Sequence, residues 1–298
     1  QGDVGCGKTI VSAISAYATY LSGFQTSFLA PTELLVDQHY NYFKNLFNET
    51  DIKISYLKNS MPAKIKDQTI DSLKSGSIDI IIGTHSLLNT SISFNQLGLC
   101  IIDEQHKFGI NQRSSFVDNR DPTGNSPHII YMSATPIPRS LALVLYQGLD
   151  YTTIKDMPKG RRHIITERVD LNSRSEMYSK IHQRLDIGEQ VFWVCPMINI
   201  SESSELESIY STHDIISGFF KDYKISVLHG QLDDNTQANT IKKFRDGEID
   251  ILVCTTVIEV GVDIPNATCI VIENSNRFGL SQLHQIRGRV GRSSRQGF

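Results

Sequence analysis

Gln1-Gly2-Asp3-Val4-Gly5-Cys6-Gly7-Lys8-Thr9 is the stretch that decides the fold, because residues 2–9 have the pattern Gly-x-x-x-x-Gly-Lys-Thr. Glycines at these positions let the backbone adopt positive φ and approach an anion closely. The N–H groups of such a loop, with the positive end of the following helix, form a nest for phosphate. We therefore predict a nucleotide-binding loop in which Lys8 reaches the β- and γ-phosphates and Thr9 ligates Mg²⁺. The alternative is a glycine-rich turn that caps a helix, since the sequence begins too late to show the preceding strand.

Length and composition describe an ordinary globular chain with more than one core. The 298 residues exceed the usual size of a single core, which predicts two domains. Hydrophobic residues make up 40% and charged residues 20% of the sequence, as in typical globular proteins. No apolar run reaches membrane-spanning length. The formal net charge of −3 argues mildly against a nucleic-acid partner, although a local groove can still be basic.

The cysteines favour a reducing compartment. None of the five forms a Cys-x-x-Cys pair, and four of them lie in or beside apolar runs. We interpret those four as reduced core residues rather than as disulfides or zinc ligands. Cys6 is expected to be exposed, because it lies in the glycine-rich loop. The five cysteines are Cys6, Cys100, Cys195, Cys254 and Cys269.

Apolar runs alternate with segments of helical period along the first half of the chain. Runs such as Ile78–Ile82 and Leu99–Ile102 are typical of strands buried on both faces of a parallel sheet. The segment after the loop predicts a helix that buries Val11, Ile14 and Ala18. This alternation predicts an α/β fold with a parallel sheet. The predicted strands are 26–30, 52–56, 78–82, 99–102 and 128–132, and the predicted helices are 10–21, 34–46 and 61–73.

The same alternation restarts after a polar stretch. Tyr151–Arg162 carries Pro158 and Gly160 and is interpreted as a linker. There is no strict sequence repeat, but the architecture is predicted to occur twice. Ligands of such sheets bind at the carboxyl ends of the strands. The predicted strands of the second half are 190–195, 225–228, 249–254 and 269–273, and the predicted helices are 174–186, 233–245 and 280–287.

Two charged groups suit phosphoryl transfer. Asp103-Glu104 follows an apolar strand, where Asp103 is placed to hold Mg²⁺ and Glu104 to activate water. The alternative is a solvated acidic strand end. Near the other end, Gln285–Arg292 places three arginines around two glycines, and guanidinium groups match phosphate oxygens. Such arginines can act as fingers in a phosphoryl-transfer transition state, and the alternative is a basic solvated or RNA-binding segment.

The ordered set of motifs resembles the superfamily 2 helicases and translocases. Each motif lies where that superfamily has it, across nearly the whole chain, so chance does not plausibly explain the set. The matches are motif I at residues 2–9, Ia at Ala30–Thr32, Ib at Gly83–His85, II at Asp103–His106, III at Ser133–Thr135, V at Thr255–Asp263 and VI at Gln285–Arg292.

Within that superfamily the chain resembles the motor part of the RecG family of bacterial ATP-dependent DNA helicases. Transcription-repair coupling factors share the segment before motif VI almost as well, but they usually have Glu where Gln105 stands. The stretches that carry the resemblance are 103–109, 134–143, 157–162, 194–198 and 277–285.

The resemblance implies two tandem RecA-like lobes, 1–156 and 157–298, each a mostly parallel sheet flanked by helices. ATP and Mg²⁺ would bind between them. The first lobe would supply Lys8, Thr9, Asp103 and Glu104. The residues implied for the second lobe are Gln285, Arg289 and Arg292 as catalytic groups and Gly261 and Asp263 near the ribose. His106, Ser133 and Thr135 would couple nucleotide state to DNA.

The same resemblance implies contacts to DNA from strand ends. Hydroxyl and backbone N–H groups there suit phosphate contact without base readout, and helix capping by Thr is the alternative. The residues concerned are Thr32, Thr84, His85, Thr255 and Thr256.

The function implied is an ATP-dependent translocase on double-stranded DNA that remodels stalled forks and Holliday junctions in recombination and repair. The implied partners are branched DNA and a single-stranded DNA-binding protein, with a monomeric motor in the bacterial cytoplasm at the nucleoid and no membrane. Two alternatives remain at this point. One is a coupling translocase that acts on RNA polymerase, and the other is a non-catalytic nucleotide-binding fragment.

Overall fold

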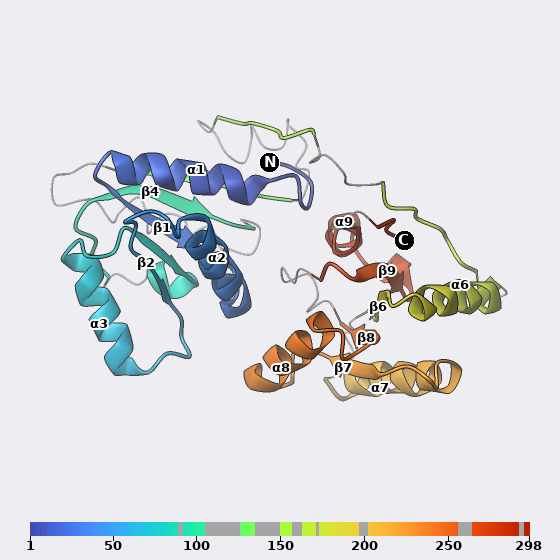
Figure 1. The fold of residues 1–298 in the computed structure, drawn as a ribbon. Coiled ribbons are helices and arrows are strands. Elements are labelled where there is room, and N and C mark those ends of the chain that lie inside the picture. The colour runs from blue at the N-terminus through green and yellow to red at the C-terminus, as the bar shows by residue number, and fades with distance from the viewer. Residues whose placement is uncertain are drawn as a thin grey trace. The chain divides into compact units, whose positions relative to one another are not determined.

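The chain divides into two compact units, Gln1–Lys155 and Asp156–Phe298. In the computed structural model the described residues are 1–88, 92–104, 126–134, 150–156, 163–170, 173–196, 202–255, 264–291 and 295–298, with backbone alone for 202–207 and 234. Each unit holds one parallel sheet with helices packed on it (Figure 1). The predicted fold class, two parallel sheets flanked by helices, is confirmed. The predicted linker falls partly outside the described residues, at 157–162.

Unit 1 is built on a five-stranded parallel sheet in the order β2-β3-β1-β4-β5. Its strands coincide with the apolar runs of the sequence, with ends within two residues of those predicted. Because β1, β3 and β4 are adjacent and parallel, their carboxyl ends meet at one edge of the sheet. The strands are β1 (Gln25–Leu29), β2 (Ile54–Leu57), β3 (Ile80–Gly83), β4 (Leu97–Ile102) and β5 (His128–Tyr131).

Among the described residues of unit 1, three α-helices pack on this sheet. In Figure 1, α1 (Lys8–Leu21) runs along the sheet, and it packs on β1 and β4. Helix α2 (Glu33–Leu46) packs on β2 and β3, and α3 (Ala63–Lys74) packs on β2. A short 3₁₀ helix, η1 (His85–Leu88), follows β3. The helices therefore start where the strands end, as the alternating pattern predicts.

The prediction for the buried face of α1 is wrong. Its buried residues are Ser12, Ala13 and Ala16, whereas Val11 and Ile14 are 47% and 62% exposed. The helical period is correct, but the stripe of larger side chains is not the one that faces the sheet. Small side chains let the helix that follows the loop pack closely on β1 and β4. The larger side chains of α1 therefore lie on its other faces.

Unit 2 is built on a four-stranded parallel sheet in the order β7-β8-β6-β9. Its core is centred on Trp193 and Phe220, which are 1% and 0% exposed. The strands are β6 (Gln190–Val194), β7 (Ile225–Leu228), β8 (Ile251–Cys254) and β9 (Ala267–Ile272). The helices are α6 (Arg174–Asp186), α7 (Glu202–Phe219), α8 (Asp234–Arg245), the 3₁₀ helix η5 (Ser275–Arg277) and α9 (Leu280–Arg287).

Helix α7 was not predicted from the sequence. Its first half is polar, and its apolar residues are spread over several faces instead of one stripe. The signal that remains is the spacing of Ile209, Ile216 and Phe220, which are buried at the core of unit 2. The parallel connection from β6 to β7 requires such a crossover element, so strand order rather than periodicity identifies this helix.

The two units share the same turn and hydrogen bond in the segment between a helix and the strand that follows it. In unit 1 the chain Ser75-Gly76-Ser77-Ile78-Asp79 leads from α3 into β3, and Gly76 has φ of +76°. In unit 2 the chain Asp246-Gly247-Glu248-Ile249-Asp250 leads from α8 into β8, and Gly247 has φ of +79°. Each Asp accepts a backbone N–H from the neighbouring strand entry, at 2.7 Å from Lys53 and 2.8 Å from Lys224. The two units therefore repeat not only the predicted order of strands and helices but also this individual hydrogen bond.

A buried glutamine begins the central strand of each unit. Gln25, 5% exposed, donates to the carbonyls of Leu73 and Ile78 at 3.0 and 2.7 Å. Its side-chain oxygen also accepts the N–H groups of Asn95 and Gln96, at 2.8 and 3.1 Å. In unit 2, Gln190 similarly donates to the carbonyls of Phe244 and Ile249. Each glutamine satisfies backbone groups at the amino-terminal edge of its sheet, where the ladder ends.

Replacing Gln25 with Leu should lower the free energy of unfolding by about 3 kcal/mol or more, because several buried backbone groups lose their partner at once. Urea unfolding followed by circular dichroism measures this loss. The control is Gln68→Leu, an exposed position on α3 with the same chemical change. Equal stability of the two variants would contradict the role assigned to Gln25.

Burial accounts for the state of the cysteines. All five thiols are free and buried. Burial raises the pKa of the Cys195 and Cys269 thiols to about 11, so both are protonated at neutral pH. The prediction that Cys6 is exposed is wrong, because this side chain is 8% exposed and turned into the loop. A Cβ on Gly2 would lie only 2.3 Å from the Sγ of Cys6.

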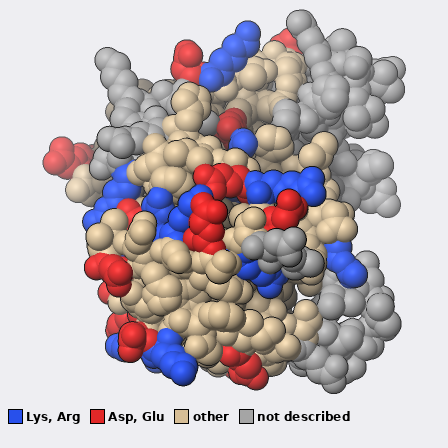
Figure 2. All heavy atoms as spheres, turned by 90° about the vertical axis from the view of Figure 1, so that its right-hand side faces the viewer, with Lys and Arg blue, Asp and Glu red and all other residues tan. Residues whose placement is uncertain are grey.

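Charges of both signs are mixed on the surface. On the face shown in Figure 2, basic and acidic side chains lie next to one another rather than in a field of one sign. Ion pairs of this kind join Lys180 to Glu167 at 3.0 Å and to Glu176 at 3.2 Å. Among the described residues, no helix is long and apolar enough to span a bilayer.

Candidate nucleotide site

The loop of residues 2–9 has the geometry of an anion nest. Gly5 and Gly7 have φ of +77° and +101°, values that glycine adopts without strain. The N–H of Cys6 donates to the carbonyl of Asp3 at 3.2 Å, which closes the turn. Helix α1 then begins at Lys8, with Gly7 as its N-cap. The loop therefore leads directly into the amino-terminal end of a helix, where an anion is stabilised.

Gly2 is needed for a different reason. It has no positive φ, but a Cβ there would lie 2.3 Å from Cys6 Sγ and 3.2 Å from Ile154 Cβ. Its N–H donates to the carbonyl of Ser133 at 3.2 Å, and Gln1 accepts the N–H of Ile154 at 2.8 Å. The start of the loop is thus held between two segments of unit 1. Ser133, a residue expected to couple nucleotide to DNA, is 7% exposed and touches the loop itself.

Lys8 lies inside the loop. Its Nζ donates to the carbonyls of Gly2 and Asp3, at 2.8 and 3.0 Å. The ammonium group is therefore held over the concave side of the loop by neutral acceptors. Phosphate oxygens carry more charge than these carbonyls and make stronger, charge-assisted hydrogen bonds. A bound nucleotide can therefore replace the two carbonyls as the hydrogen-bond partner of Lys8.

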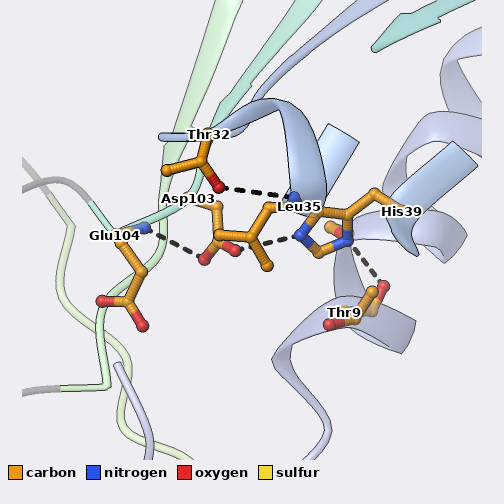
Figure 3. Close-up of polar contacts among 7 residues, drawn as sticks. Thr9, Thr32, Leu35, His39, Asp103 and Glu104 are labelled. Atoms are coloured by element: carbon orange, nitrogen blue, oxygen red, sulfur yellow. Dashed lines mark hydrogen bonds and ion pairs between the residues drawn. The ribbon is translucent and has the colours of Figure 1, made fainter. Parts of the chain in front are cut away.

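Asp103 and Glu104 directly follow strand β4, which ends at Ile102. The N–H of Asp103 donates to the carbonyl of Leu29 in β1, at 3.0 Å. Oδ1 of Asp103 accepts the N–H of Glu104 at 3.0 Å. Glu104 has φ of +48°, a conformation rare outside glycine and typical of functional sites. The chain turns sharply here, so that the two carboxylates point in different directions (Figure 3).

His39 contacts Asp103, and we did not predict this contact from the sequence. Nε2 of His39 lies 3.2 Å from Oδ2 of Asp103, although the residues are 64 positions apart. His39 is on the buried face of α2, 8% exposed, and its ring packs on Phe28 with centroids 4.5 Å apart. Figure 3 shows the ring beside the Asp103 carboxylate. The signal in the sequence is a histidine on an otherwise apolar helix face.

The residues at this edge fit Mg²⁺. Thr9 and Asp103 offer a hydroxyl and a carboxylate, the hard oxygen donors that Mg²⁺ prefers. Magnesium keeps several waters and takes substrate phosphates as ligands, so one or two protein ligands suffice. The described residues hold no group of three His, Cys, Asp or Glu side chains placed for a metal.

Motifs Ia and Ib reach the same edge of the sheet. Thr32 is the N-cap of α2, and its hydroxyl accepts the N–H of Leu35 at 3.4 Å. Thr84 is buried, with its hydroxyl 3.2 Å from that of Ser86, whereas His85 is exposed. Capping, the alternative reading for Thr32, is therefore observed. This cap uses one lone pair of the Thr32 hydroxyl and the N–H of Leu35. The hydroxyl and the other N–H groups of the first turn can still bind a second partner.

In unit 2, three of the described motif residues are buried. Thr255, which follows β8, is 6% exposed. Gln285 lies on α9 and is 4% exposed, and Arg289 lies in the turn after that helix and is 5% exposed. Burial of Arg289 contradicts the solvated basic segment considered from the sequence, because an arginine is rarely buried without a structural or functional partner.

Six predicted site residues lie outside the described residues, and the roles expected for them remain predictions. They are His106, Thr135, Thr256, Gly261, Asp263 and Arg292.

The comparisons with known proteins agree with the fold. Residues 1–144 match the DEAD/DEAH box helicase family, and residues 174–294 match the helicase conserved C-terminal domain. The ATP-dependent DNA helicase RecG of Aquifex aeolicus is 41% identical over 298 residues, which are 100% of this chain and 37% of the relative. RecG of Escherichia coli is 39% identical over 295 residues, 99% of this chain and 43% of the relative.

A solved structure gives the same result. RecG bound to a three-way DNA junction is 39% identical and superposes with a TM-score of 0.79, over 98% of this chain and 37% of that chain. The chain thus spans about two fifths of the length of the relatives it matches. The two helicase domain families together account for most of it. The two parts of the chain therefore match these two helicase domain families, and the chain is similar over its whole length to RecG.

Proposed function

We propose that this chain is the ATP-driven motor of a DNA helicase that remodels branched double-stranded DNA, such as stalled forks and Holliday junctions, in recombination and repair. The observation that carries the proposal is the match along the whole chain to RecG, one example of which was solved on a three-way junction. No specific observation favours a coupling translocase or a non-catalytic nucleotide-binding protein.

The geometry of unit 1 supports ATP hydrolysis. The loop of residues 2–9 would bind the phosphates through its N–H groups and Lys8. Glu104 would orient the attacking water and take its proton, since a carboxylate at this position is within the same site as Asp103. Mg²⁺, held by Thr9 and Asp103, would neutralise charge on the β- and γ-phosphates.

Residues of unit 2 complete the proposed reaction. We assign Gln285, Arg289 and Arg292 to the stabilisation of transition-state charge, and Gly261 and Asp263 to the ribose. His106, Ser133 and Thr135 are assigned to coupling between the nucleotide and DNA. Hydrolysis would then drive a conformational cycle of the motor.

The proposed partner is DNA bound through its phosphates. Thr32 and Thr84 lie at the carboxyl ends of adjacent strands, which suits sequence-independent contact, and we assign the same role to His85, Thr255 and Thr256. We further propose a monomer that works at the nucleoid in the cytoplasm, with a single-stranded DNA-binding protein as a partner.

The test is ATP hydrolysis by the purified protein in the presence of a three-way junction, a linear duplex of equal length or a single strand. The junction should stimulate turnover most strongly. Lys8→Ala should reduce that turnover by about 10²–10³-fold, because it removes a preorganised charge from the phosphates. Absence of turnover with every DNA contradicts the motor, and equal stimulation by junction and linear duplex contradicts the branched substrate.

A further inference from the structure

We propose that His39 is a positioning residue for the nucleotide-bound magnesium ion: it holds the Asp103 carboxylate in the orientation that binds the ion. This inference rests on the proposed function, because it deepens the site described above. Its experiment is designed so that the two can fail separately.

The first step is the chemistry of the contact. An ionised carboxylate only accepts hydrogen bonds, so at 3.2 Å from Asp103 Oδ2 the His39 Nε2 must carry the proton. Asp103 Oδ1 accepts the backbone N–H of Glu104 at 3.0 Å. Each carboxylate oxygen therefore has one donor, and each keeps lone pairs for a cation. A carboxylate held at both oxygens cannot rotate freely, which favours one direction of metal binding.

The second step is the tautomer. When Nε2 of a neutral imidazole carries the proton, Nδ1 is an acceptor. The single ring proton is therefore committed to Oδ2 of Asp103. Nε2 is thus the ring nitrogen that orients the carboxylate.

The third step is the rigidity of the ring. His39 lies on the buried face of α2 and packs on Phe28 of β1, which itself packs edge-on against Phe43 with centroids 5.5 Å apart. The helix is fixed at its start by the Thr32 cap. Helix, strand and ring therefore hold Nε2 at one place relative to the end of β4. An apolar side chain would fill the same space without needing polar partners, so packing does not explain why a histidine is here.

Partners of this kind change metal affinity without touching the metal. Outer-shell hydrogen bonds orient the ligands, and their removal typically costs about 10–100-fold in metal affinity or activity. His39 is expected to act at this level, because it contacts Asp103, the residue expected to ligate the ion. The expected signature is a change in the magnesium dependence of nucleotide binding, with little change in binding without magnesium.

The experiment is a titration of Mg²⁺ into the purified protein with a fluorescent ATP analogue, repeated in EDTA. His39→Ala should raise the Mg²⁺ concentration at half-maximal binding by about 10–100-fold. His39→Gln should recover most of this loss, because the Gln amide can donate to Asp103. Asn45→Ala, an exposed position on the same helix, is the control and should match the wild type. Binding in EDTA should be the same for all four proteins.

The alternative outcomes are distinct. An unchanged Mg²⁺ midpoint in His39→Ala, with or without a lower melting temperature, overturns the proposal and leaves His39 as a packing residue. A shift in His39→Gln as large as that in His39→Ala also overturns it, because the donor would then be irrelevant. If His39→Ala does not fold, the midpoint of His39→Gln against Asn45→Ala decides: a shift of under tenfold supports the proposal, and a larger one overturns it. Wild-type protein that binds nucleotide without any dependence on Mg²⁺ contradicts the proposed function as well.

Discussion

Replacing Glu104 with Gln should slow DNA-stimulated ATP hydrolysis by about 10²–10⁴-fold, the usual contribution of a general base. The amide has nearly the same size and shape as the carboxylate, but it cannot take a proton from water. Binding of the magnesium nucleotide should stay close to that of the wild type, because Lys8, Thr9 and Asp103 remain. The measurement is steady-state turnover with saturating junction DNA, together with the affinity for a fluorescent ATP analogue.

The backbone at Glu104 makes this substitution specific. Its φ of +48° places the residue in the left-handed region, where an ordinary side chain costs about 1–3 kcal/mol unless the surroundings hold it. The hydrogen bond from its N–H to Asp103 Oδ1 is one such restraint. Gln tolerates this backbone as well as Glu does, so the variant tests the carboxylate alone.

A matched control is Glu49→Gln, which removes an exposed carboxylate from the same unit. It should hydrolyse ATP at the wild-type rate. Near-normal turnover in Glu104→Gln would remove Glu104 from the site, and equal losses in both variants would assign the effect to net charge.

Much of the fold follows from local sequence. The bounds of α6, β7 and α9 are those that the residue pattern predicts, because apolar runs and helical period are written within each element. The buried face of α1 does not follow. Its larger side chains form an apolar stripe, yet the small Ser12, Ala13 and Ala16 face the sheet, since close approach of the helix backbone decides the contact.

The candidate site is predictable only in part for a related reason. Asp103 and Glu104 are found from sequence because a carboxylate at the end of a buried strand has a local signature. The partnership of His39 with Asp103 has none. It depends on β1 and β4 being neighbours and on α2 following β1, which the crossovers of a parallel sheet determine. The four hydrogen bonds of Gln25 depend on the same long-range order.

Replacing Arg292 with Ala should lower the rate of ATP hydrolysis by about 10³–10⁵-fold, the range seen for arginine fingers. The affinity for ATP should change far less. A finger acts on charge that develops as the γ-phosphoryl group is transferred, so its loss appears in turnover and not in ground-state binding. Single-turnover hydrolysis with saturating nucleotide and DNA measures the chemical step, and equilibrium binding of the ATP analogue measures affinity.

Arg287→Ala is the matched control, because it removes an arginine from the same motif. The guanidinium of Arg287 lies 3.1 Å from Nδ1 of His284, so it has a local partner on α9. This variant should therefore lose much less rate than Arg292→Ala. If Arg292→Ala lost affinity for ATP as strongly as it lost rate, Arg292 would bind the ground state of the nucleotide. The transition-state charge would then have to be stabilised by Arg289, which is 5% exposed and therefore already shielded from solvent.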